Sequence, residues 1–304
     1  MEHLYLQSAG GGQLHCRIWE PEGTPAALLQ IVHGIAEHVE RYDDFARFLN
    51  AHGILVAADD HMGHGKTLRE GETQGYFEGG WLSAVADSRQ LQQWLMEQYP
   101  GVPCFLLGHS MGSFMARTML FTYPDSGIRG AIISGTGWQP AIALKVGLAL
   151  CRREEKRYGD RATSAALNRL VFGGYNKKFK PNRTAYDWLC TDEAVVDRYI
   201  DDPLCGFDAT IGLARDMLTG IRMIEQPENL GKMNKDLPVW FFAGDHDPVG
   251  NMGQGVRRAA EAFRQAGMKH VTVTLYEGRH EMLNEKNKQQ VYADVLHWLE
   301  SQRG

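Results

Sequence analysis

The pentapeptide Gly-His-Ser-Met-Gly at residues 108–112 is the strongest chemical signal in this sequence. The Gly-x-Ser-x-Gly pattern also arises by chance, but here it lies directly between an apolar run (102–110) and a segment with helical periodicity (110–124). On such a strand-to-helix turn the serine hydroxyl is exposed above a sheet, and flanking glycines avoid collisions with the neighbouring helix and strand. We therefore expect Ser110 to be a nucleophile. The alternative is an ordinary strand–turn–helix with an incidental serine.

A serine hydroxyl needs a base to remove its proton, and the base needs a carboxylate that orients it. After a turn of this kind the chain order is serine, then aspartate or glutamate, then histidine. Of the 12 histidines, His280 alone follows a predicted strand (271–278) downstream of a suitable acid, so we expect it to be the base. The acid lies in the turn after the strand predicted at 237–245, which contains both Asp245 and Asp247. We favour Asp247, because Asp245 is closer to the strand end and could instead cap or pin the loop.

Acyl transfer also needs two N–H donors aimed at the developing oxyanion. One is expected from Met111, the residue after the nucleophile, at a helix N-terminus whose N–H groups and dipole point toward the site. The other is expected from the loop at 33–38, which follows an early apolar run. The backbone of Ile35 is the predicted donor in this loop. We expect His33 and His38 to have structural rather than chemical roles.

A second loop rich in glycine and histidine, at 60–65, resembles a metal or phosphate site at first sight. Asp60, His61 and His64 could in principle hold zinc. Their spacing fits no common zinc site, however, and no fourth ligand is evident. We predict a hydrogen-bonded turn here, and we expect neither a metal nor a cofactor, because the serine chemistry needs none.

The elements that must position these groups alternate between short apolar runs and amphipathic helical patterns, which is typical of a doubly wound, mostly parallel α/β sheet. An antiparallel hairpin is predicted before it, with strands at 4–8 and 14–19 around a Gly-rich turn. The other predicted strands are 26–34, a run beginning at residue 54, 102–110, 128–136, 237–245 and 271–278, and the predicted helices are 41–53, 80–100, 110–124, 253–267 and 287–302.

The stretch at 138–236 interrupts this alternation, because it is helical in pattern and holds no clear sheet strand. It is too long for a connecting loop, since loops beyond about 15 residues are uncommon. We therefore predict an α/β core at 1–137 and 237–304, and a helical cap at 138–236 over the C-terminal sheet edge, where ligands of open α/β sheets bind. We expect an apolar inner face on the cap. Candidates for that face, or for packing the cap onto the core, are Trp138, Ile142, Val146, Leu148, Leu170, Phe172, Trp188, Leu213 and Met217.

Composition and charge argue against other function classes. The chain has 304 residues, is 43% hydrophobic and 23% charged, and carries a formal net charge of -5, which offers no basic footprint for nucleic acid. Its five cysteines are scattered and are expected to be reduced thiols. No signal-peptide pattern or membrane-spanning run is visible, so we expect a cytoplasmic protein. Basic clusters at 152–157 and 177–180 are expected to be solvated; the alternative is attraction to an anionic membrane surface.

The motifs together resemble the monoacylglycerol lipase and bacterial lysophospholipase group of α/β-hydrolases. The resemblance implies the α/β-hydrolase fold and a serine carboxylesterase that works through an acyl-enzyme. It assigns the acid to Asp247, beside Ser110 and His280, and the oxyanion donors to the loop of Ile35 and to Met111. The blocks that carry it are residues 33–42, 60–65, 108–112, 244–247 and 278–283, and a cap segment at 187–207.

The expected partner is a small-molecule ester with an acyl chain, with transient membrane-surface contact as an open alternative. Two rival functions remain. A thioesterase, an amidase or a peptidase would use the same three residues on another bond. A non-catalytic binding protein of this fold would usually lack one of the three, and this chain has all of them.

Overall fold

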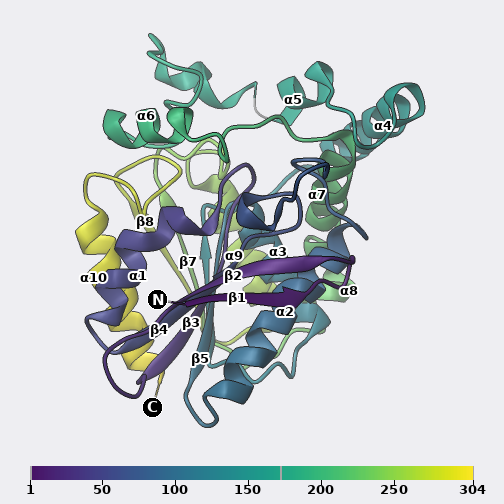
Figure 1. Ribbon diagram of the computed structural model, residues 1–304. Coiled ribbons are helices and arrows are strands. Elements are labelled where there is room, and N and C mark those ends of the chain that lie inside the picture. The colour runs from purple at the N-terminus through teal and green to yellow at the C-terminus, as the bar shows by residue number, and fades with distance from the viewer. Residues whose placement is uncertain (1, 172, 304) are drawn as a thin grey trace.

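The computed structural model describes residues 2–171 and 173–303, and within them the chain forms one mixed sheet. Its eight strands follow the order β1-β2-β4-β3-β5-β6-β7-β8 (Figure 1). The pairs from β4 to β8 are parallel, whereas β1 pairs with β2, and β2 with β4, in the antiparallel sense. The expected fold class, a mostly parallel sheet with an N-terminal antiparallel hairpin, is confirmed. The strands are β1 Glu2–Gln7, β2 Gln13–Trp19, β3 Ala27–Val32, β4 Ile54–Asp59, β5 Cys104–His109, β6 Gly130–Ser134, β7 Val239–Gly244 and β8 Val271–Tyr276.

The central strands are buried on both faces, which is why they read as continuous apolar runs in the sequence. In β5, Phe105 and Leu107 belong to the core on one side of the sheet, while Cys104 and Leu106 belong to the core on the other. Helices α1 and α10 cover the first side, and α2, α3 and α9 cover the second (Figure 1). These helices are α1 Asp43–Asn50, α2 Trp81–Gln98, α3 Met111–Thr122, α9 Gln254–Gln265 and α10 Lys288–Gln302.

In its described residues, the segment predicted as a cap adds five α-helices between β6 and β7. Helices α4, α5 and α6 lie beyond the C-terminal edge of the parallel strands (Figure 1). Helix α7 instead runs down toward the core, and its residues Met217 and Ile221 share a buried cluster with Trp81 of α2 and Met115 of α3. The segment therefore contributes both to a layer above the sheet and to packing against it. Its helices are α4 Ala141–Tyr158, α5 Ala165–Val171, α6 Glu193–Asp201, α7 Ile211–Ile224 and α8 Pro227–Leu230.

Within residues 2–171 and 173–303, no helix combines the length and the apolar composition that a bilayer crossing requires.

Candidate active site

Ser110 lies on the sharp turn between β5 and α3. Its backbone has φ 54° and ψ -121°, a strained conformation for a residue with a side chain. A Cβ on Gly112 would lie 2.0 Å from the carbonyl oxygen of Val32, and one on Gly108 would lie 2.4 Å from that of Gly112. Both distances are far below van der Waals contact, so the glycines are needed for the reason predicted from the sequence.

His280 and Asp247 form a buried pair. The Nδ1 atom of His280 lies 3.0 Å from Oδ1 of Asp247, and this oxygen also accepts the N–H of Val249 at 2.9 Å. Both side chains are excluded from solvent. The sequence left two aspartates in this turn, and the structure brings Asp247 against His280. Asp245 is half-exposed and accepts the N–H of Gly278 at 3.2 Å, so it pins the neighbouring loop.

The charge environment of His280 favours its protonated form. Burial lowers the pKa of this imidazole, but the charge and hydrogen bond of Asp247, together with the charges of Glu281 and Glu37, outweigh that effect and raise the pKa above its ordinary value. The His280 ring lies 4.8 Å from the ring of His109 and 5.1 Å from that of Trp188, centroid to centroid. Burial lowers the pKa of His109 to about 4, so His109 stays neutral beside it.

The loop at 33–38, which we call the oxyanion loop, lies directly beside Ser110. A Cβ on Gly34 would lie 2.6 Å from Oε1 of Glu37 and 3.1 Å from the Cβ of Ser110, so a side chain there would force these neighbours to move. The N–H of Gly34 donates to Oε1 of Glu37 at 2.5 Å. Among the described residues, no hydrogen bond uses the N–H of Ile35 or Met111, the two predicted oxyanion donors.

The histidine-rich loop at 60–65 packs against the oxyanion loop. Asp60 accepts the N–H of Val39 and of Lys66, each at 2.9 Å, so it forms the hydrogen-bonded turn expected from the sequence. The ring of His61 stacks on that of His33 with centroids 3.9 Å apart. Both rings are buried inside the protein.

One group of potential metal ligands occurs elsewhere in the described chain. His38, Asp202 and Cys205 bring one ligand atom each within 4.8 Å of one another. Nε2 of His38 and Oδ2 of Asp202 already pair at 2.8 Å. Burial raises the pKa of the Cys205 thiol, so a metal would have to displace its proton. We therefore assign His38 and Asp202 to a hydrogen-bonded pair.

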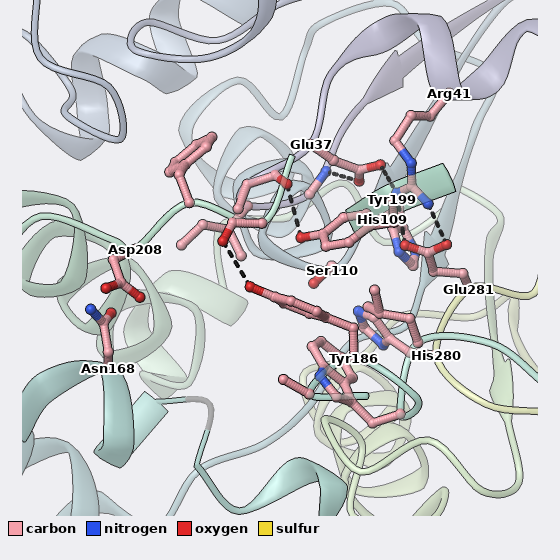
Figure 2. Close-up of a pocket in the computed structure, with 18 of the residues that line it drawn as sticks. Glu37, Arg41, His109, Ser110, Asn168, Tyr186, Tyr199, Asp208, His280 and Glu281 are labelled. Carbon is pink, nitrogen blue, oxygen red and sulfur yellow. Dashed lines mark hydrogen bonds and ion pairs between the residues drawn. The ribbon is translucent and has the colours of Figure 1, made fainter. Parts of the chain in front are cut away.

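A buried charge cluster next to Ser110 was not predicted. Arg41 lies between two carboxylates (Figure 2): its Nη1 is 2.9 Å from Glu37, and its Nη2 is 2.6 Å from Glu281. Arg41 lowers the pKa of Glu281 against the effect of burial, so Glu281 is ionised. The four-residue spacing of Glu37 and Arg41 is visible in the sequence. Glu281, however, is 240 residues from Arg41, and no sequence signal links them.

Ser110 and His280 open into the same cavity of about 260 Å³ (Figure 2). The oxyanion loop and the charge cluster form one end, and Asn168 and Asp208 lie at the other. The segment at 138–236, called the cap segment below, contributes ten residues to the wall of this cavity. They are Asn168, Gly173, Ala185, Tyr186, Trp188, Leu189, Tyr199, Gly206, Phe207 and Asp208.

Of the apolar residues proposed for that wall, only Trp188 lines the cavity among those described. Leu213 and Met217 pack into the main core instead, which was the stated alternative. Ile142 and Val146 are exposed on α4, because they lie on the face of that helix turned away from its packing partners. Trp138 borders a separate cavity, Leu148 is buried on α4, Leu170 is exposed, and Phe172 lies outside the described residues.

Comparison with known proteins agrees with this architecture. Residues 23–287 match the family described as serine aminopeptidase S33. The chain is 44% identical over 294 residues to monoglyceride lipase of Rattus norvegicus, covering 96% of this chain and 87% of that protein. It is 28% identical over 306 residues to monoacylglycerol lipase of Mycolicibacterium smegmatis, covering 99% and 97%.

Two solved structures, of an esterase and of a lipase, also resemble this chain over its whole length. A thermostable carboxyl esterase from Bacillus coagulans, solved in complex with glycerol, superposes with a TM-score of 0.92 at 29% identity, over 100% of this chain and 99% of that one. A lipase solved in an open form superposes with a TM-score of 0.89 at 27% identity, again over 100% and 99%. The chain therefore belongs to the serine aminopeptidase S33 family of α/β-hydrolases, is similar to its monoglyceride lipases, and is a hydrolase that acts on esters.

Proposed function

We propose that this chain is a carboxylesterase of the monoacylglycerol lipase type that works through an acyl-enzyme on Ser110. The observation that carries the proposal is the buried pair of His280 and Asp247, 3.0 Å apart, at the wall of the cavity into which Ser110 opens. In the proposal Ser110 is the nucleophile, His280 is the base and Asp247 orients the base. The N–H groups of Ile35 and Met111 bind the oxyanion.

The steps follow from these positions. With Nδ1 of His280 donating to Asp247, Nε2 is left to take the proton of Ser110 as its oxygen attacks the ester carbonyl. The tetrahedral oxyanion is stabilised by the two backbone N–H groups. His280 then gives its proton to the leaving alcohol, and a water molecule repeats the sequence on the acyl-enzyme. Asp247 stabilises the imidazolium and holds its tautomer.

The charge cluster favours an ester over an aminoacyl substrate. An aminopeptidase needs a carboxylate that is free to pair with the substrate ammonium group. Glu37 and Glu281 lie in the cavity wall at the end occupied by the oxyanion loop, and both are already paired with Arg41 (Figure 2). The names of the relatives then suggest a monoacylglycerol as the ester. We further propose that residues 138–236 act as the cap whose wall receives the acyl chain.

Hydrolysis by wild type and by Ser110→Ala tests this function. The panel contains p-nitrophenyl esters, monoglycerides, acyl-CoAs and aminoacyl amides, together with labelling by a fluorophosphonate probe. We expect wild type to prefer oxygen esters and to be labelled, and Ser110→Ala to lose both properties while keeping its thermal melting temperature. A labelled Ser110→Ala protein would refute the nucleophile. Preference for acyl-CoAs or amides would favour the thioesterase or peptidase alternative, and no hydrolysis would favour a binding protein.

We also propose transient contact with a membrane surface through α4 and a location in the cytoplasm. Helix α4 exposes Ile142 and Val146, at 76% and 59% of their surface, and carries the basic cluster at 152–157 toward its other end. Exposed apolar groups together with nearby cations are suited to anionic lipid interfaces. The location in the cytoplasm is supported separately by the five cysteines, which are all free thiols and suit a reducing compartment.

The membrane contact can be tested directly. Sedimentation with anionic liposomes should fall when Ile142 and Val146 are both replaced by serine.

A further inference from the structure

Two donors of the cap segment bind one backbone oxygen of the oxyanion loop, that of Ala36. The hydroxyl of Tyr199, on α6, donates to the carbonyl oxygen of Ala36 at 2.9 Å, and the N–H of Gly206 donates to the same oxygen at 3.0 Å. His38 and Asp202, which pair at 2.8 Å, also connect the oxyanion loop to the cap segment. The donors lie more than 160 residues along the chain from the loop that they hold.

Ala36 needs such support because of its backbone conformation. Its φ is 54°, in the left-handed region that residues with a Cβ rarely adopt. A conformation of this kind persists only when surrounding contacts hold it. The two hydrogen bonds from the cap segment act on this residue, which directly follows Ile35. On the other side of Ile35, Glu37 holds the N–H of Gly34 at 2.5 Å. The predicted oxyanion donor is therefore held between two anchors, one in the core and one in the cap.

Tyr199 also covers the charge cluster. The guanidinium carbon of Arg41 lies 4.8 Å from the centre of the Tyr199 ring. Figure 2 shows the ring beside Arg41, with its hydroxyl directed to the backbone oxygen that it binds. Tyr199 is buried, at 6% exposure, and lines the cavity. Its ring and its hydroxyl thus have separable contacts, the first with Arg41 and the second with Ala36.

We infer that Tyr199 is a positioning residue for the oxyanion hole: its hydroxyl holds Ala36 so that the N–H of Ile35 faces the site beside Ser110. The inference rests on the function proposed above and adds a role for the cap. Besides forming a wall for the substrate, the cap sets the geometry of a transition-state donor. Loss of this contact should therefore slow the chemical step more than it weakens substrate binding.

Tyr199→Phe tests this separation, because it removes the hydroxyl and keeps the ring over Arg41. We would measure kcat and KM for p-nitrophenyl acetate, whose short acyl group needs little of the cap wall. We would also measure inhibition by a trifluoromethyl ketone that forms a tetrahedral oxyanion on Ser110. We expect kcat to fall about five- to tenfold, as for loss of one neutral hydrogen bond, and ketone binding to weaken by a similar factor, with KM little changed. If Tyr199 served only as part of the pocket wall, Tyr199→Phe would raise KM and leave kcat and the ketone affinity at their wild-type values.

Tyr276→Phe is the matched control, because it removes a buried tyrosine hydroxyl that donates to Asp294 at 2.8 Å, on α10. It should keep wild-type kcat. If Tyr199→Phe does not fold, Asp202→Asn decides the question. This variant weakens the pairing with His38, which also connects the cap segment to the oxyanion loop, and it should also lower kcat. A folded Tyr199→Phe with wild-type kcat and ketone affinity would overturn the inference, as would wild-type kcat in Asp202→Asn when it is the deciding variant. An inactive wild type would instead refute the proposed function.

Discussion

His280 Nδ1 lies 3.0 Å from Asp247 Oδ1, while the other acid of the same turn, Asp245, points to a different loop. The turn after β7 thus places two aspartates two residues apart in different environments. Asp247 is fully buried against the imidazole, and Asp245 is 44% exposed on its side chain. This difference makes the assignment of the acid testable by two substitutions of the same type.

Asp247→Asn should reduce kcat far more than Asp245→Asn. An amide in place of the orienting carboxylate favours the wrong imidazole tautomer, and in well-studied triads the loss is on the order of 10⁴ in kcat. Asp245→Asn weakens only contacts with Gly278 and with the exposed His246, so its kcat should stay within about tenfold of wild type. Steady-state hydrolysis of one ester by both variants gives the comparison. If Asp245→Asn were the worse enzyme, the acid would be Asp245.

The pH dependence of kcat/KM should show an acid limb that belongs to His280. The base must be neutral to take the serine proton, so activity is lost as the pH falls through its pKa. Burial lowers this pKa, but Asp247, Glu281 and Glu37 together raise it by more, so we expect the midpoint above the ordinary histidine value of about 6.5. Asp247→Asn removes one of the charges that raise the pKa and should move the limb to lower pH. A wild-type midpoint below the ordinary value would contradict this electrostatic description.

Arg41→Met should destabilise the fold at neutral pH. It leaves Glu37 and Glu281 buried without their cation, and removal of one partner from a buried ion pair costs about 3–5 kcal/mol of unfolding free energy. Because Arg41 depresses the pKa of Glu281, the stabilisation exists above the unfolded carboxylate pKa and disappears as the pH falls through the folded value. Urea unfolding at neutral and acid pH measures both effects. Arg47→Met is the control, since Arg47 pairs with Asp43 at the surface and should change stability little. Equal effects of the two variants would show that the buried cluster contributes nothing special.

The dependence of kcat/KM on acyl length should rise to a maximum and then fall. Each methylene moved from water into an apolar cavity is worth about 0.8 kcal/mol, or roughly fourfold, until the cavity is full. Phe207→Ala removes an aromatic group from the cavity wall and should flatten the rising limb. Tyr158→Ala removes an exposed aromatic side chain on α4 outside that wall and should leave the profile unchanged. A flat wild-type profile from acetyl to dodecanoyl would count against an acyl pocket built by the cap.

The apolar residues proposed for the cap wall show where sequence reasoning stops. Ile142 and Leu213 both lie on amphipathic helical patterns, yet the first is exposed and the second is packed in the main core. Helical periodicity predicts which residues share a face of a helix. It does not predict whether that face meets the core, a cavity or solvent, because the answer depends on how helices of different parts of the chain pack.

The sequence by itself determined the order of strands and helices and the positions of Ser110, His280 and the acidic turn. It could do so because these are local properties: a strand buried on both faces is a continuous apolar run, and the turn at Ser110 requires the flanking glycines Gly108 and Gly112. The tertiary structure alone decided that Arg41 joins Glu37 to Glu281 and that Tyr199 holds Ala36. Those contacts join segments more than 160 residues apart. They exist only because the sheet and the cap bring the segments together, and no local pattern of residues encodes them.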